Sequence, residues 1–117
     1  MKLEVGMYVR LVNDVEDIVV INKIANVFET TILTENDGSI YQGEYTKENV
    51  VKASYNIIDI LEVGDYVNGY YVEDVLKTFV NVAVGSNYFQ SPTIYEKDIK
   101  SVITHEQIEQ MSYKVGE

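Results

Sequence analysis

The stretch Leu3-Glu4-Val5-Gly6-Met7-Tyr8-Val9 returns later in the chain as Leu61-Glu62-Val63-Gly64-Asp65-Tyr66-Val67. Six of the seven residues are identical, at an offset of 58 in a chain of 117 residues. Self-similarity at a fixed period is typical of a duplicated structural unit. The repeat therefore predicts two copies of one small module, which we place at residues 1–56 and 57–117.

A second pair of segments supports the duplication. Tyr45-Thr46-Lys47-Glu48-Asn49-Val50 and Tyr95-Glu96-Lys97-Asp98-Ile99-Lys100 carry Tyr, Lys and an acid in the same order. The offset is 50 here instead of 58, which indicates that the loops of the second copy are about eight residues shorter. Each segment predicts a single 3₁₀ or α turn that leads into a short strand.

The chain is predicted to be mainly β, because Tyr, Val, Ile, Thr and Phe dominate its periodic segments. Strands are expected at residues 7–11, 18–24, 27–34, 40–42, 51–53, 70–75, 78–84, 101–103 and 113–115. Tight turns are expected at Ala25-Asn26, Asp37-Gly38 and Asn68-Gly69. Helices are expected at residues 55–60 and 105–112, the second because Thr104 and Gln107 form a capping box.

The order of a short strand, longer strands, a 3₁₀-like turn and a final strand resembles the SH3-like small barrel. The expected fold is two tandem SH3-like small β-barrels with a short connecting helix and a short C-terminal helix. A module of about 55–60 residues is marginal alone, so we expect the two barrels to pack together. A single intertwined β-sandwich built from the same strands is the alternative.

The charge balance limits the class of partner. Nineteen acidic residues face nine basic ones, for a net charge of −10, and residues 1–59 and 60–117 each carry −5. Direct binding to nucleic acid is disfavoured, because a phosphate backbone requires positive charge. Binding to a basic surface is permitted and would be steered electrostatically. Solubility alone is the competing explanation of the acidity.

No motif predicts an enzyme, a cofactor or a metal site. The chain has no cysteine and no phosphate-binding glycine motif. His105 is the only histidine and has no Ser or Cys partner at a recognisable spacing, so we expect a solvated surface residue. The acids at residues 14–17 lack the alternating ligands of a calcium loop. No signal peptide or membrane-length apolar run is present, so a cytoplasmic protein without membrane contact is expected.

Two segments of the second half resemble known proteins. Residues 57–69 (IIDILEVGDYVNG) and 101–107 (SVITHEQ) are similar to segments of small acidic accessory proteins of phages, prophages and mobile elements of Gram-positive bacteria. The function of that family is mostly unassigned, so the resemblance transfers no site residues. It implies a mobile-element context, in which small proteins often bind and inhibit host machinery, including CRISPR–Cas effectors and other nucleases.

These observations favour a non-enzymatic interaction protein that docks on a basic, nucleic-acid-binding surface of a host protein and inhibits it as a nucleic-acid mimic. Exposed tyrosines beside carboxylates suit such an interface. The expected partner-binding residues are Asp14, Glu16, Asp17, Glu35, Asp37, Tyr41, Tyr70, Tyr71, Glu73, Asp74 and Tyr88. The alternatives are a phage-particle assembly role, with self-association as a homodimer left open, and a binder of a small ligand such as a signalling nucleotide in a groove between the barrels.

Overall fold

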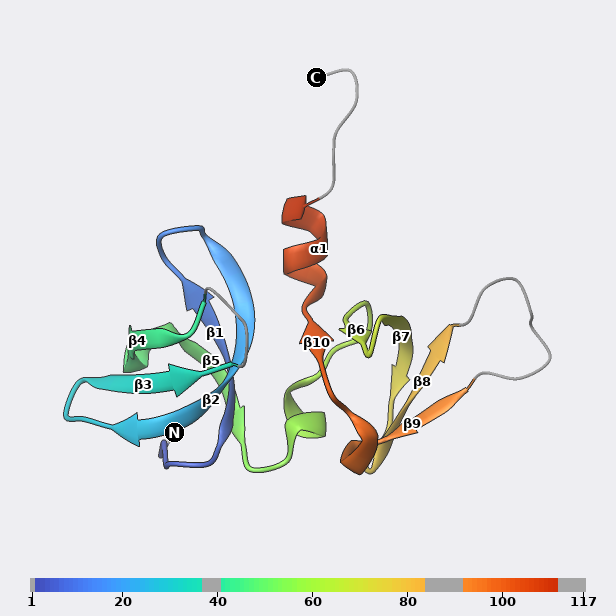
Figure 1. Cartoon of the computed structure of the whole chain (residues 1–117), viewed down its shortest axis with the longest axis horizontal. Coiled ribbons are helices and arrows are strands. Elements are labelled where there is room, and N and C mark those ends of the chain that lie inside the picture. The colour runs from blue at the N-terminus through green and yellow to red at the C-terminus, as the bar shows by residue number, and fades with distance from the viewer. Residues whose placement is uncertain (1, 37–40, 84–91, 112–117) are drawn as a thin grey trace, which may run out of the picture.

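The computed structural model describes residues 2–36, 41–83 and 92–111, which form two five-stranded antiparallel sheets side by side (Figure 1). The first sheet, in the order β4-β3-β2-β1-β5, consists of β1 (Tyr8–Asn13), β2 (Ile18–Val27), β3 (Thr31–Glu35), β4 (Gly43–Thr46) and β5 (Val50–Ser54). The second sheet, in the order β10-β6-β7-β8-β9, consists of β6 (Tyr66–Val67), β7 (Tyr70–Val75), β8 (Phe79–Ala83), β9 (Thr93–Tyr95) and β10 (Val102–Ile103). The mainly β class expected from the sequence is confirmed.

The two sheets share one topology. In each, four consecutive strands form a meander and the fifth strand pairs with the first. A single 3₁₀ turn precedes the fifth strand in both, η1 (Lys47–Asn49) and η3 (Glu96–Asp98), as the sequence predicts. The two edge strands of a sheet do not pair with each other within the described ranges, so each sheet is open. The module boundary between residues 56 and 57 stays a prediction.

Matching backbone hydrogen bonds show where the two copies differ in length. Gly6 N donates to Ile24 O at 2.9 Å, and Gly64 N donates to Val72 O at 3.0 Å. The offset between the copies is therefore 58 at the glycine and 48 at its partner. The shortening lies in the hairpin between the first two strands, which the second module closes with the two-residue turn Asn68-Gly69. Both turn residues have positive φ, at 52° and 86°, as a tight hairpin requires.

The prediction of a tight turn at Ala25-Asn26 is wrong. Strand β2 continues to Val27, and the register against β3 shifts between Ile24 and Asn26, so the extra residue is a β-bulge. A bulge breaks the alternation of side chains in the same way that a turn does, which explains the error. The chain reverses at residues 28–30 instead. Strand β4 also begins later than expected, at Gly43.

Two short helical elements join the modules. The connecting helix is a 3₁₀ turn, η2 (Ile57–Ile60), and the C-terminal helix is α1 (His105–Met111), close to the predicted bounds. The capping box of α1 is confirmed, since Gln107 N donates to Thr104 Oγ1 at 3.1 Å and Thr104 N donates to Gln107 Oε1 at 3.0 Å. Thr104 Oγ1 also donates to Val19 O at 2.6 Å, which ties the start of α1 to the first sheet. The expected strand at 113–115 and the turn at Asp37-Gly38 lie outside the described residues.

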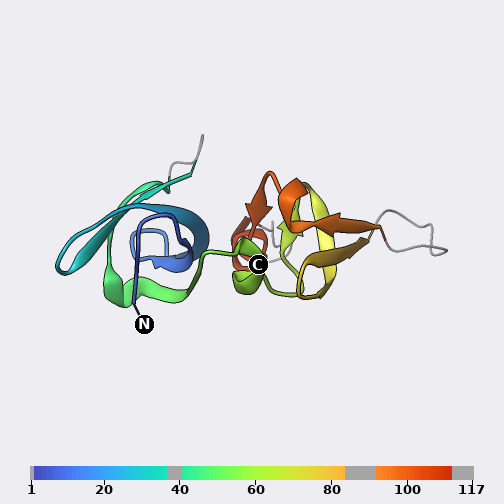
Figure 2. The ribbon, with the colours of Figure 1, turned by 90° about the horizontal axis from the view of Figure 1, so that it is seen from below.

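The hydrophobic cores of the two modules are not independent. The first contains Val9, Leu11, Ile18, Val20, Ile24 and Ile32. The second contains Ile58, Ile60, Leu61, Val67, Val72, Val80 and Val82, together with Ile21 from β2 of the first sheet. Tyr8 of β1 also packs against this second core. Figure 2 shows η2 and α1 between the two sheets, so the modules are packed together as expected.

Candidate functional site

The hairpin between β1 and β2 presents three carboxylates and one apolar side chain to solvent. Asp14, Glu16 and Asp17 are all exposed, and Val15 between them is 90% exposed. We call residues 14–17 the acidic turn. The second module replaces this hairpin with its two-residue turn, so the acidic turn belongs to the first module alone.

Two asparagines fix the conformation of the acidic turn. Asn13 Oδ1 accepts hydrogen bonds from Val15 N at 3.0 Å and from Glu16 N at 3.1 Å, which is an Asx-type turn. Asn49 of η1 donates from Nδ2 to Val12 O at 3.0 Å and to Asp14 Oδ2 at 2.9 Å. The carboxylates are therefore presented from an ordered turn that is anchored to the next 3₁₀ element.

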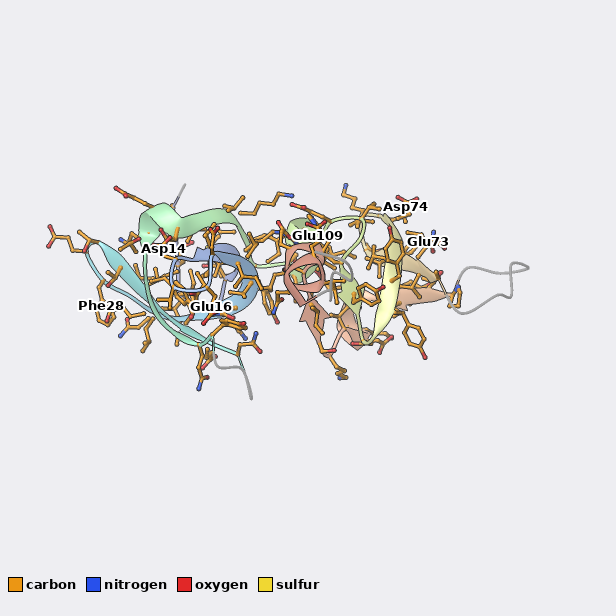
Figure 3. All side chains as sticks on the ribbon, turned by 90° about the horizontal axis from the view of Figure 1, so that it is seen from above. Asp14, Glu16, Phe28, Glu73, Asp74 and Glu109 are labelled. Carbon is orange, nitrogen blue, oxygen red and sulfur yellow. The ribbon has the colours of Figure 1, made fainter. Side chains whose placement is uncertain are left out.

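Helix α1 adds negative charge on the same side of the molecule. Figure 1 shows the β1–β2 hairpin and α1 rising on the same side. Glu109 of α1 is 77% exposed. Seen from above, it lies between Asp14 and Glu16 on the first module and Glu73 and Asp74 on the second (Figure 3). Helix α1 thus carries an exposed carboxylate that lies, in this view, between the labelled acids of the two modules.

The other predicted acids fall in separate places. Glu73 and Asp74 are exposed on β7, where Glu73 occupies the bulge equivalent to Ala25. Glu35 is exposed at the end of β3, in a groove between the modules. Asp37 lies outside the described residues, as does Tyr88. The structure thus brings Asp14, Glu16 and Asp17 together and does not join the remaining acids to them in one cluster.

The predicted tyrosines have different environments. Tyr70 and Tyr71 are exposed on β7, and the ring of Tyr71 makes an edge contact with Tyr66 at 5.7 Å between centroids. Tyr41 is half-buried and not fully exposed, and its expected interface role stays a prediction. It packs against the first core, because its backbone carbonyl accepts hydrogen bonds from Asn22 and Tyr45 and holds it there.

The modules are joined by a buried arginine that the sequence analysis did not identify. Arg10 of β1 is 1% exposed and reaches into the second module. Its guanidinium donates to Asp65 through two bonds, Nη1 to Oδ2 at 2.8 Å and Nη2 to Oδ1 at 3.0 Å. It also donates to Glu106 Oε1 at 2.6 Å and to Ile60 O at 3.1 Å. We call Arg10 and its acidic partners Asp65, Glu62 and Glu106 the joint.

Asp65 is the acceptor on which the joint depends. It is fully buried, and besides Arg10 it accepts hydrogen bonds from Glu62 N at 2.8 Å and His105 N at 2.9 Å. The equivalent position in the first copy is Met7, whose sulfur is 3.2 Å from Glu4 N in the corresponding contact. The one mismatch between the two seven-residue repeats is thus the residue that joins the modules. The sequence signal that could have identified this contact is the change from Met7 to Asp65 in an otherwise identical repeat.

Glu62 and His105 line the exposed rim of the joint. Lys52 Nζ lies 2.9 Å from Glu62 Oε2, and His105 Nε2 lies 2.8 Å from Glu62 Oε1. Partial burial opposes ionisation of Glu62, but the hydrogen bonds from Lys52 and His105 and the charge of Arg10 outweigh it and lower its pKa to about 2. The hydrogen bond to Glu62 in turn raises the pKa of His105, and the negative charges of Glu106 and Asp65 act in the same direction. Partial burial and the charge of Arg10 act in the opposite direction but are outweighed. His105 is half-buried, so the expected solvated surface histidine is wrong.

Glu62, His105 and Glu106 also place three ligand-type atoms within 4.8 Å of one another. Their carboxylates already hold cations of the protein, since Glu62 pairs with Lys52 and Glu106 with Arg10. A divalent cation would have to compete with these ion pairs. The arrangement is therefore that of a structural ion-pair network.

Alanine substitutions of the two equivalent glycines, Gly6 and Gly64, distinguish the cost of backbone strain from the cost of a close contact with α1. Gly6 and Gly64 have φ of 92° and 98°, where a side chain is strained. A Cβ at Gly64 would lie 3.3 Å from His105 Cβ, whereas at Gly6 the nearest atom is Tyr55 Cε1 at 3.8 Å. We expect Gly6→Ala to lower the free energy of unfolding by about 1 kcal/mol and Gly64→Ala by about 2–3 kcal/mol. Equal losses in urea titrations would show that α1 does not pack on Gly64.

The Glu62–His105 pair is expected to stabilise the protein most in mildly acidic solution. The contribution of Glu62 is complete above its ordinary pKa of 4.5 and is lost as the pH falls toward 2. The contribution of His105 is complete below its ordinary pKa of 6.5 and is lost as the pH rises through its raised value. The Glu62–His105 pair therefore contributes most between about pH 5 and about pH 6.5.

We expect Glu62→Gln to lower the free energy of unfolding by about 1–2 kcal/mol in this window, since solvent screens the half-exposed pair. Urea titrations across the pH range measure this directly. His105→Gln serves as the matched variant and should flatten the decline on the alkaline side, while Lys52 and Arg10 preserve most of the decline on the acid side. A profile for His105→Gln that is parallel to the wild type would contradict the assignment.

No protein-family model, curated protein or solved structure matches the chain. Within the described ranges, none of the helices has the length and apolar character needed to cross a membrane.

Proposed function

We propose that the chain is a non-enzymatic interaction protein that docks on a basic surface of another protein through its acidic turn and helix α1. The observation that carries the proposal is the ordered acidic turn, where three exposed carboxylates surround an exposed valine. Exposed carboxylates alone would serve solubility. A turn fixed by Asn13 and Asn49 has a lower entropy cost on binding, and an apolar tip adds a contact that solubility does not need.

The proposed partner is a nucleic-acid-binding protein of a bacterial host. Carboxylates on a fixed scaffold can occupy positions that phosphates take on such a surface, and complementary charge accelerates the encounter. The resemblance to mobile-element proteins supports a role as an inhibitor of a host defence protein. A Cas nuclease is an example of such a target. Each module is proposed to be an open SH3-like barrel, which is supported by the shared strand order and by the 3₁₀ turn before each fifth strand.

The proposal is tested by capture of partners from a lysate of a Gram-positive host with tagged protein. The test variant is Asp14→Asn/Glu16→Gln/Asp17→Asn, which removes three charges and keeps hydrogen-bonding side chains. Asn is well suited to position 17, where φ is 52°. We expect at least about a tenfold loss of affinity for a basic partner, and weaker capture by the wild type at high salt.

The matched control is Glu29→Gln/Glu44→Gln/Asp98→Asn, which makes the same change in net charge at exposed positions away from the turn. The control should retain at least about half of the capture. Equal losses in the two variants would mean that net charge alone acts, and the docking role of the acidic turn would be wrong. Recovery of only the tagged chain and its own copies would contradict the docking proposal and favour an assembly role.

A further inference from the structure

A groove of about 680 Å³ lies between the two modules, apart from the acidic turn. The first module contributes Tyr8, Lys23 and the end of β3, and the second contributes η3 and residues 99–102. Figure 1 shows η3, the orange turn at the foot of β9, on the side opposite to the rising helix α1. A volume of this size falls in the range of small-molecule sites, which form preferentially at domain interfaces.

Among the described residues that line the groove, basic side chains outnumber acidic ones, in contrast to the whole chain. Three of the nine basic residues line it, Lys23, Lys97 and Lys100, against the two acids Glu35 and Glu96. Glu96 is engaged, because its Oε2 accepts a hydrogen bond from Ile58 N at 3.1 Å. In the part of the chain that the structure describes, none of the three lysines has a carboxylate within the 4.0 Å of an ion pair. The local excess of positive charge favours an anion there in spite of the net charge of −10.

The groove also offers an aromatic wall. Tyr55 lines it and is 54% exposed, and its hydroxyl donates to Glu4 Oε1 at 3.0 Å, which fixes the orientation of the ring. A fixed, exposed ring is a platform on which a flat base can stack. Lys23 Nζ lies 5.5 Å from the ring centroid of Tyr8, which holds that ammonium at the groove. Ammonium groups and an exposed ring in one groove match the two parts of a nucleotide.

We propose that this groove binds a nucleoside phosphate, with the phosphates at Lys23, Lys97 and Lys100 and the base against Tyr55. The site is distinct from the acidic turn, and the proposal does not depend on the proposed docking function. It also explains why lysines are concentrated at one inter-module groove of an acidic protein.

Isothermal titration of the full chain with ATP, AMP, inorganic pyrophosphate and adenosine tests the proposal. We expect ATP to bind at least about tenfold more tightly than adenosine, because the phosphates supply the charge contacts. The variant Lys23→Gln/Lys97→Gln/Lys100→Gln should lose at least about tenfold in affinity for ATP. Tyr55→Leu should weaken the binding of ATP and leave that of pyrophosphate unchanged.

The matched control is Lys2→Gln/Lys47→Gln/Lys77→Gln, which makes the same change in net charge outside the groove and should bind ATP like the wild type. All variants alter exposed or half-exposed side chains, and an unchanged unfolding midpoint verifies their fold. The absence of binding heat from every phosphate probe up to about 5 mM, at two temperatures about 15 °C apart, would overturn the proposal, because the binding enthalpy changes with temperature and is not zero at both. Equal losses in the two lysine variants would also overturn it.

Discussion

Asp65→Ala is expected to lower the free energy of unfolding by about 3–5 kcal/mol, the largest effect of any single substitution considered for this protein. The substitution removes both bonds to the buried guanidinium of Arg10 and also leaves Glu62 N and His105 N without their acceptor. Arg10 is held charged by Asp65 and Glu106, whose attraction outweighs the burial that would lower its pKa. Glu106 stays as a partner, so the loss should fall toward the lower end of this range.

Urea unfolding of Asp65→Ala measures the effect, with Asp74→Ala as the control at an exposed position. The control should change the free energy of unfolding by no more than about 0.5 kcal/mol. The double variant Asp65→Ala/Arg10→Met should recover much of the loss, because it removes the unpaired buried charge and keeps an apolar stem. A loss of less than about 1 kcal/mol for Asp65→Ala would show that Arg10 is adequately solvated without it, and the joint would not be the link between the modules.

Ile21→Ala is expected to lower the free energy of unfolding by about 2–4 kcal/mol. The substitution should destabilise the second module, although Ile21 belongs to the first. Ile21 is in β2 of the first sheet, is 6% exposed, and packs in the core of the second module. The cavity left by its side chain should therefore reduce the hydrogen-exchange protection of β6, β7 and β8. Native-state amide exchange resolves this effect strand by strand.

Ile24→Ala is the matched control for the Ile21 variant. Ile24 is in the same strand and equally apolar, but its side chain belongs to the first core. It should lose a similar free energy of unfolding, with the loss of protection strongest in β1, β2 and β3. Identical exchange patterns for the two variants would show that the modules unfold as one indivisible unit, without separate cores.

Much of the fold could be predicted from local signals in the sequence. The repeat at Leu3 and Leu61 predicted two modules, the capping box at Thr104 and Gln107 predicted α1, and Asn68-Gly69 predicted a hairpin turn. The capping box and the turn act through neighbouring residues, and the repeat is visible when the two segments are compared, so none of the three signals needed tertiary information. The bulge at Ala25 was missed because a one-residue insertion and a turn both interrupt the alternation of a strand.

The joint could not be predicted in the same way. Arg10 and Asp65 are 55 residues apart in sequence, and only the packing of two modules brings them together. His105 looked like a lone histidine because its partner, Glu62, lies 43 residues away in the turn of the second repeat. Asp14, Glu16 and Asp17 were predicted as partner-binding residues from their charge, whereas the order of the turn that holds them depends on Asn49, which a distant 3₁₀ turn supplies. The difference between Met7 and Asp65 in the two repeat copies is the signal that marks the Arg10 contact.

Site-specific photo-crosslinking from position 15 tests the docking proposal most directly. A photoreactive amino acid in place of Val15 stands at the tip of the acidic turn and is 90% exposed, so it disturbs no contact within the fold. The same amino acid in place of Val51, an exposed position on β5, is the control. We predict that position 15 crosslinks in a host lysate to a basic, nucleic-acid-binding protein, that about 500 mM salt abolishes the product, and that position 51 gives none. Equal products from both positions, or none from position 15, would contradict the assignment of the acidic turn as the docking site.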